Sequence, residues 1–257
     1  MSAPVLAAAS SHPTLMHKAY LQEYDRADII IHDFPFLEGY DIFRGLDNKL
    51  RVYDSHNCES RLYRQLHPEV KSAAIHEIVD DAERDLLRHV DMVLYCNEDD
   101  LKAFRAIPDA PEFQSHYAPN GTLLPPLEAS DFGFRKALQS VTSAVFLGSA
   151  HPPNTEAALF IANKIAPRIQ EVEFRFVGSC LPEGNYPGNV RRLGVVSDSE
   201  KREILRTTDV ALNPMTGGSG SNVKVLDYFS YAIPVVSTEF GMRGINATAG
   251  EHYLLAS

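Results

Sequence analysis

The sequence predicts an α/β protein in which helices cover both faces of parallel sheets. Short runs rich in Val and Ile alternate along the 257 residues with longer amphipathic stretches. Most of the short runs are continuously apolar, which is typical of strands buried on both faces of a parallel sheet. Because strands and helices alternate, we expect a doubly wound fold.

Seven segments carry the strand pattern: residues 27–31, 50–54, 91–96, 143–148, 172–178, 209–213 and 233–238. The strongest helical pattern covers residues 69–89, where apolar residues recur every three or four positions. A second helix is expected over residues 154–166, with Pro153 near its first turn and Pro167 at its end.

A proline-rich stretch divides the chain into two parts of similar length. Residues 117–131 read YAPNGTLLPPLEASD, with three prolines, an Asn-Gly turn signal and no helical period. Domains of about 100 to 150 residues are usual. We therefore expect one domain over residues 1–125 and a second over residues 126–257.

Composition and charge exclude several classes of protein. The formal net charge is −10, and the longest basic cluster is the pair Arg191 and Arg192, so nucleic acid is not an expected partner. No apolar run approaches the roughly 20 residues that span a bilayer. Cys58, Cys96 and Cys180 form no CxxC pair, which favours free thiols over disulfides or a zinc site. These features predict a soluble, cytoplasmic protein.

The segment over residues 209–238 carries the clearest chemistry. An apolar strand runs into the glycines 217, 218 and 220, and a helix is expected to follow. A Gly-rich turn at this place lets backbone N–H groups approach an anion, which favours a phosphate or diphosphate ligand. Lys224 lies in the first turn of the expected helix, where a cation opposes the helix dipole and is better explained by an anionic ligand.

Asp227 follows Lys224 by three residues on the same predicted helix. One interpretation gives the pair an ammonium for phosphate and a carboxylate for ribose hydroxyls. The other makes Lys224 and Asp227 an exposed ion pair that stabilises the helix by a few tenths of a kcal/mol. GxxxxGK[ST] and an early GxGxxG are both absent, which argues against kinases, GTPases and NAD-dependent dehydrogenases.

Several blocks of the chain resemble GT-B glycosyltransferases of the large family 4 type. The most specific are GSGSNVKVLDYFSYAIPVVST over residues 218–238 and the PPN block over residues 152–154. The similarity extends, in the family's order, over most of residues 25–250. It implies two Rossmann-like domains and transfer of a sugar from a nucleotide-diphosphate sugar to a saccharide or lipid-linked acceptor.

The resemblance also implies retention of configuration, no bound metal and no cofactor apart from the donor substrate. Polysaccharide or glycolipid biosynthesis is the expected process, and peripheral membrane association is compatible with it. The chain resembles such enzymes from part-way through the N-terminal domain and stops before their last elements, so we expect both ends to be incomplete. The sequence specifies neither the donor base and sugar nor the oligomeric state.

By this similarity, a loop cradles the diphosphate with five residues: Gly218, Ser219, Gly220, Ser221 and Asn222. Lys224 would neutralise the diphosphate, and Asp227 would hold the ribose, although the family usually has a glutamate there. His56 would be the catalytic residue, stabilising charge on the departing diphosphate. An alternative role for His56 is a capping or core-edge histidine.

One departure from the family pattern concerns charge. Many members carry an Arg and a Lys after the first strand of the C-terminal domain, whereas residues 148–154 here read GSAHPPN. Lys224 would then bear most of the neutralisation, with His151 as a weaker second contact. The family usually has two glutamates eight residues apart. Here Ser219 stands in the place of the first and Asp227 in the place of the second.

Two rival functions fit parts of this sequence. A catalytically silent nucleotide-sugar-binding or partner module is favoured by the missing terminal elements. A GT-B-fold sugar-nucleotide epimerase shares the architecture, but the GSGSNVKVLD block argues against it.

Three further groups of residues have simpler interpretations. Glu98, Asp99 and Asp100 resemble an acidic metal motif but are better explained as the first turn of a helix. Asn57 and Glu59 are suited to begin a helix in the same way, Asn57 as its N-cap. His32 and Asp33, after the first strand, have no partner that the sequence identifies.

Overall fold

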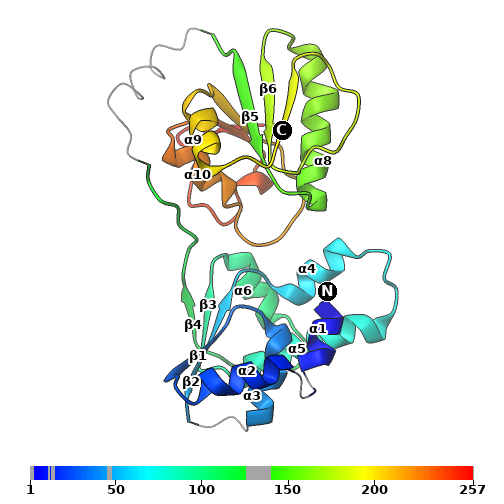
Figure 1. Cartoon of the computed structure of the whole chain (residues 1–257), viewed down its shortest axis with the longest axis vertical. Helices are drawn as coiled ribbons and strands as arrows, with labels where there is room; N and C mark the ends of the chain where they lie inside the picture. Colours follow the sequence, from blue (N-terminus) through cyan, green and yellow to red (C-terminus); the bar gives the residue numbers. More distant parts are fainter. Residues whose placement is uncertain (1–2, 11, 13–14, 45–47, 126–139, 257) are drawn as a thin grey trace. The chain divides into compact units, whose positions relative to one another are not determined.

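The computed structural model describes residues 3–10, 12, 15–44, 48–125 and 140–256. The chain divides into two units by the contacts between its residues. Unit 1 comprises Met1–Pro119 with Ser219–Ser221, and unit 2 comprises Asn120–Gly218 with Asn222–Ser257. Each unit contains one parallel sheet with helices packed on it (Figure 1).

Unit 1 is built on a four-stranded parallel sheet in the order β1-β2-β3-β4. Its strands are β1 (Ile29–His32), β2 (Leu50–Ser55), β3 (Met92–Tyr95) and β4 (Ser115–Tyr117). Two helices precede β1, namely α1 (Ala3–Ser10) and α2 (Leu15–Tyr24), and those between the strands are η1 (Pro35–Leu37), α3 (Gly39–Arg44), α4 (Glu59–Leu66), α5 (Ala73–His89) and α6 (Glu98–Arg105). The predicted helix over residues 69–89 is confirmed as α5, which begins four residues later.

The core of unit 1 lies between its sheet and the helices α5 and α6. Leu86 and Leu87 of α5 pack with Tyr53 of β2, Val93 of β3 and Phe104 of α6, all at most 1% exposed. The predicted acidic first turn is confirmed in α6, where the Asn97 side chain caps the helix by accepting from the Asp99 N–H at 2.9 Å.

The start of α4 differs from the expectation that Asn57 caps it. The cap residue is Cys58, whose side chain makes no capping hydrogen bond to the backbone of the helix. Instead the fully buried carboxylate of Glu83, on α5, accepts from the N–H groups of Glu59 at 2.8 Å and Ser60 at 2.9 Å. A carboxylate 24 residues further along the chain than Glu59 therefore accepts the free N–H groups of the first turn of α4. Local sequence patterns do not reveal a contact of this range.

Unit 2 is built on a six-stranded parallel sheet in the order β10-β9-β8-β5-β6-β7. The strands are β5 (Ser143–Leu147), β6 (Glu173–Val177), β7 (Val190–Gly194), β8 (Val210–Asn213), β9 (Val235–Ser237) and β10 (Leu254–Leu255). Counted along unit 2, the order is 6-5-4-1-2-3, that of a doubly wound Rossmann sheet. The predicted doubly wound α/β class is confirmed.

Helices cover both faces of this sheet, as the continuous apolar strands require. The first is α8 (Pro152–Phe160), which continues into the π-helical turn η2 (Ile161–Ile165) and the 3-10 turn η3 (Ala166–Arg168). The others are α9 (Asp198–Arg206), α10 (Lys224–Ser230) and the short η4 (Phe240–Met242). The predicted helix over residues 154–166 corresponds to α8 and η2, with Pro152 and Pro153 both in its first turn.

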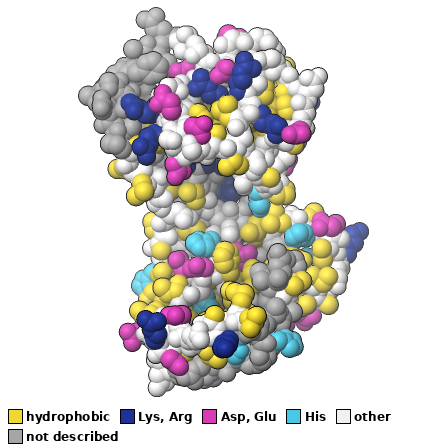
Figure 2. Space-filling view, in the orientation of Figure 1, with side chains coloured by type: hydrophobic (Ala, Val, Ile, Leu, Met, Phe, Trp, Pro, Cys, Tyr) yellow, Lys and Arg dark blue, Asp and Glu magenta, His cyan; other side chains and the backbone are white. Residues whose placement is uncertain are grey.

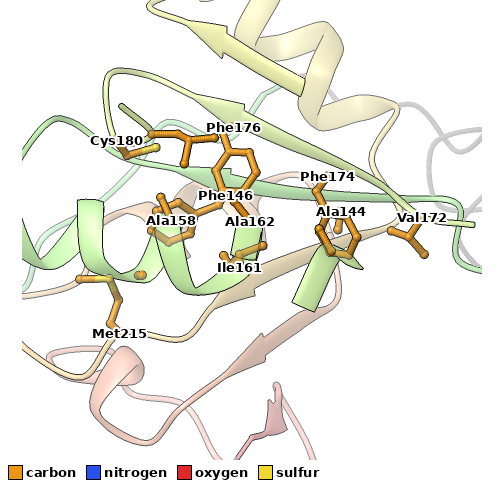
Figure 3. Packing of buried hydrophobic residues seen from close by; sticks show 13 residues of the cluster. Ala144, Phe146, Ala158, Ile161, Ala162, Val172, Phe174, Phe176, Cys180 and Met215 are labelled. Atoms are coloured by element: carbon orange, nitrogen blue, oxygen red, sulfur yellow. The ribbon is translucent and has the colours of Figure 1, made fainter. Parts of the chain in front are cut away.

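The side chains of β5 alternate between the two faces. Ala144 and Phe146 pack with Ala158 and Ile161 in the cluster beneath α8 that Figure 3 shows. Val145 and Leu147 belong to a second cluster with residues of α9 and α10, among them Leu205, Val225 and Tyr228. Strict alternation with apolar residues on both faces makes β5 the centre of the unit 2 core.

Three short strands were absent from the sequence-based prediction. β4, β7 and β10 are short or carry exposed side chains, as at Arg191 and Arg192 of β7, so none forms a continuous apolar run. On the face of unit 2 that Figure 2 presents, basic and acidic side chains are interspersed and no large basic patch forms. Within the residues described above, no helix combines the length and apolarity that crossing a membrane requires.

Candidate functional site

The most distinctive place in unit 2 is the point where the strand order reverses. β5 and β8 are neighbours, but the chain winds outward from them in opposite directions. In open α/β sheets, ligands bind outside the carboxyl ends of the strands at such a switch point. The segments that follow β5, β8 and β9 therefore define the candidate site.

The segment after β8 contains the predicted Gly-rich loop and leads to α10 (Figure 1). Gly218 adopts φ = +126°, a left-handed conformation that side chains rarely tolerate. Lys224 is the first residue of α10, as the sequence predicted for the first turn.

The ammonium group of Lys224 bridges the segments after β5 and β8. Its Nζ donates to Asn154 Oδ1 at 2.5 Å, contacts Met215 Sδ at 3.7 Å and lies 4.4 Å from the centre of the Phe146 ring. In the described part of the chain, no carboxylate forms an ion pair with Lys224. The cation is thus held at the switch point by neutral groups.

This environment weakens the hold of Lys224 on its proton. Burial and the neighbouring Arg243 charge lower the pKa of Lys224 to about 8, partly opposed by the Cys180 thiol. A partly buried cation without a carboxylate is costly unless an anion completes its surroundings. A strongly shifted lysine at a switch point is therefore a candidate binding residue.

Arg243 is a second cation of this site, and it follows β9 and η4. Its guanidinium lies so close to Gly218 that a Cβ added there would be 2.6 Å from Arg243 Nη2. The guanidinium also lies 4.6 Å from the centre of the Phe240 ring, and Nη1 donates to the Phe240 carbonyl at 3.3 Å. Burial, Lys224 and Arg243 together lower the pKa of His151, which places that imidazole in the same positive field.

Asn222 connects the Gly-rich loop to the segment that carries Arg243. Its N–H donates to the Arg243 carbonyl at 3.2 Å, and its amide Nδ2 donates to Asn213 Oδ1 at 3.1 Å and to the Gly241 carbonyl at 2.8 Å. A Cβ at Gly241 would lie 2.6 Å from the Asn213 carbonyl, so only glycine fits this junction. Asn222 therefore holds the loop in place from inside the protein.

Asp227 and Lys224 do not form the ion pair that one interpretation of the sequence offered. Asp227 Oδ2 pairs instead with Lys201 Nζ of α9 at 2.6 Å, and Oδ1 accepts from Thr122 Oγ1 at 3.3 Å. Lys224 is directed to Asn154. The two side chains thus contact different neighbours, Lys224 on the side of α8 and Asp227 on the side of α9.

The remaining predicted site residues belong to unit 1. Ser219, Gly220 and Ser221 group with unit 1, so only Gly218, Asn222, Lys224 and Asp227 of the predicted set lie in unit 2. His56 follows β2 at the carboxyl edge of the unit 1 sheet, is exposed, and its ring lies 5.8 Å from that of Phe34.

Two residues of the site were missed by the sequence analysis, Asn154 and Arg243. Asn154 is the last residue of the PPN block over residues 152–154, but the sequence predicted no role for it. Arg243 stands five residues after the predicted strand 233–238, so its position beyond the carboxyl end of a strand was an available signal. The sequence did not reveal the strand order that places Arg243 beside Gly218.

Comparison with known proteins identifies the family of unit 2. Residues 142–257 match the family model described as glycosyl transferases group 1. No curated protein sequence matches the chain.

Solved structures of similar fold cover nearly the whole chain. HepE from Anabaena, solved with UDP and glucose, has 16% identity and a TM-score of 0.68 over 96% of this chain and 71% of its own. Sucrose-phosphate synthase from Thermosynechococcus elongatus has 14% identity and a TM-score of 0.61 over 86% of this chain and 58% of its own. A trehalose-6-phosphate synthase has 15% identity and a TM-score of 0.57 over 93% and 62%.

The chain thus spans 58% to 71% of the length of these three proteins, and less than two thirds of sucrose-phosphate synthase and of the trehalose-6-phosphate synthase. At these identities the similarity shows the fold, while the family model covers the unit that contains Lys224 and Arg243. Residues 142–257 therefore belong to the group 1 glycosyltransferases, and the chain has the GT-B fold of these enzymes.

Proposed function

We propose that this protein transfers a glycosyl group from a nucleoside-diphosphate sugar to a saccharide or lipid-linked acceptor. The single observation that carries the proposal is the Lys224 ammonium at the switch point of a group 1 glycosyltransferase unit, held by neutral groups. A diphosphate supplies the negative charge that this site lacks. The complexes of HepE with UDP and glucose support a nucleotide-sugar donor.

Each predicted residue has a part in the proposed reaction. Lys224 binds the diphosphate, and the loop around Gly218 approaches it closely because no side chain intervenes. Asp227, neutralised by Lys201, is the proposed acceptor of hydrogen bonds from the ribose hydroxyls. Asn222 keeps the loop in position through its bonds to Asn213 and Gly241.

His56 has the catalytic part in this proposal. As the glycosyl bond breaks, negative charge grows on the departing diphosphate, and a hydrogen bond or positive charge from His56 would stabilise it. Retention of configuration, independence from metal ions and a cytoplasmic location remain part of the proposal. They come from the family resemblance and from composition.

Calorimetric titration of the full chain with UDP, GDP and ADP tests the donor site. We expect one of them to bind, and Lys224→Gln to weaken that binding about 10-fold to 100-fold, because a charge-assisted contact is worth about 1.5 to 3 kcal/mol. Lys164→Gln is the matched control, since Lys164 is exposed in the turn that extends α8.

Either titration can contradict the proposal. If none of the three nucleotides binds the folded chain, or if Lys224→Gln binds as well as the unaltered protein, the assigned donor site is wrong. Interconversion of a nucleotide sugar without any acceptor would instead identify an epimerase.

A further inference from the structure

Lys224 alone does not balance the charge of the ligand proposed for this site. A nucleoside-diphosphate sugar carries two negative charges on its diphosphate, and the departing nucleoside diphosphate carries more. One ammonium supplies a single positive charge. A site that holds the departing group needs at least one further cation close to Lys224.

His151 is poorly suited to be that second cation. It precedes α8 at the carboxyl end of β5, so it lies on the correct side of the sheet. Its pKa, however, is lowered by burial and by the charges of Lys224 and Arg243, so the imidazole is mainly neutral at pH 7. A neutral imidazole can donate a hydrogen bond but does not neutralise phosphate.

Arg243 has the position and the geometry that the second cation requires. Its guanidinium lies against the backbone of Gly218, the residue whose missing side chain opens the loop. The Phe240 ring and carbonyl hold the guanidinium, and the Asn222 N–H holds the Arg243 backbone. Guanidinium groups are always charged and bind phosphate oxygens in a bidentate way.

We propose that Arg243 is the second cation of the diphosphate site and that, together with Lys224, it makes the site prefer nucleoside diphosphates to monophosphates. This inference rests on the proposed function, because it assigns a residue to the same donor site. The Arg243 guanidinium approaches the ligand from the β9 side of the switch point, and Lys224 approaches from the α10 side. A monophosphate offers this pair of cations one phosphate group instead of two.

The experiment compares a nucleoside diphosphate with the matching monophosphate. The full chain is titrated by calorimetry with whichever of UDP, GDP or ADP binds, and then with UMP, GMP or AMP to match. We expect Arg243→Gln to weaken diphosphate binding about 10-fold to 100-fold and monophosphate binding much less. Arg243→Lys keeps the positive charge but loses the bidentate guanidinium, so we expect diphosphate affinity to fall several-fold.

Arg168→Gln is the matched control for this series. Arg168 is exposed in η3, at the far end of α8, and this end lies at the amino edge of the parallel strands because the helix runs back against them. Its substitution should leave both affinities unchanged. Circular dichroism establishes that each variant is folded before titration, and Arg243→Lys decides the result if Arg243→Gln does not fold.

The outcomes separate this inference from the function on which it rests. If Lys224→Gln weakens diphosphate binding but Arg243→Gln and Arg243→Lys bind within twofold of the unaltered chain, Arg243 is not the second cation. An equal loss for diphosphate and monophosphate would assign Arg243 a purely structural part. If Lys224→Gln also has no effect, the donor site itself is misplaced.

Discussion

At the scale of single residues, the shifted pKa of Lys224 predicts a pH dependence for the proposed donor site. Burial and Arg243 lower that pKa to about 8, so Lys224 is charged below pH 8 and neutral above it. Only the charged form attracts the diphosphate, and binding therefore weakens as the pH rises through 8. Above this pH, binding also takes up a proton, because the anion raises the pKa of Lys224 again.

Calorimetry of nucleoside-diphosphate binding between pH 7 and pH 9.5 measures this effect. We expect affinity to fall by up to about tenfold per pH unit above pH 8, since each bound ligand then requires one proton. Titration in buffers of different ionisation enthalpy should reveal the proton uptake. Lys224→Gln should show a flat profile, and a flat profile in the unaltered chain would contradict the assigned environment of Lys224.

At the scale of elements, α4 depends on a residue of another helix for its first turn. Four donors meet the buried Glu83 carboxylate: Tyr53 Oη at 3.2 Å, Glu59 N at 2.8 Å, Ser60 N at 2.9 Å and Cys58 Sγ at 3.5 Å. Glu83→Gln replaces one acceptor oxygen with an NH2 group that faces donors. We expect a loss of about 1 to 3 kcal/mol in the free energy of unfolding, because a buried donor is left unsatisfied.

Urea unfolding followed by circular dichroism measures that loss, and hydrogen exchange of residues 59–66 locates it at α4. Glu112→Gln is the control, because Glu112 is exposed, and its effect should stay within about 0.5 kcal/mol. Unchanged stability and exchange in Glu83→Gln would show that the carboxylate does not hold the helix start.

At the scale of the whole molecule, the two units carry different parts of the proposed reaction. Lys224 and Arg243, which are proposed to bind the diphosphate, are in unit 2, whereas His56 is in unit 1. We expect His56→Ala to lower sugar transfer or donor hydrolysis about 100-fold to 1,000-fold, because it removes one group that stabilises developing charge. Nucleoside-diphosphate affinity should remain within about twofold.

Assays of turnover and of binding on the same preparation check this separation. His116→Ala is the matched control, since His116 is an exposed histidine of β4 in the same unit. Full turnover in His56→Ala would remove the catalytic role from His56. A parallel loss of nucleotide affinity would make His56 a binding residue.

The inner strands of both sheets and the edge strand β1 could be predicted from the sequence, while the edge strands β4, β7 and β10 could not. β5 reads SAVFL and is buried at every position, so its residues indicate a buried strand before any partner is known. β7 reads VRRLG and lies at the sheet edge, where Arg191, Arg192 and Leu193 are exposed. Such a strand has no continuous apolar run to recognise, in contrast to β1, whose three isoleucines mark it as a strand although it lies at the edge of the unit 1 sheet.

The sequence did not predict contacts between side chains of elements that lie far apart along the chain. His32 pairs with Asp41 at 3.1 Å, and Arg51 binds the same carboxylate at 2.8 Å, so the neighbouring Asp33 is not the partner. Asp227 pairs with Lys201 for the same reason, since α9 packs beside α10 through the core that they share. Sequence spacing suggested the nearer Lys224 for Asp227 and identified no partner for His32.

The sequence by itself determined the α/β class, the Gly-rich loop and the place of Lys224 at the start of a helix, because apolar periodicity and glycine conformation are local properties. The tertiary structure decided which charges surround that lysine. Asn154, Lys224 and Arg243 follow three different strands, and they are brought together by the order β9-β8-β5 in the sheet. That order is set by how whole strands and helices pack, so no local pattern contains it.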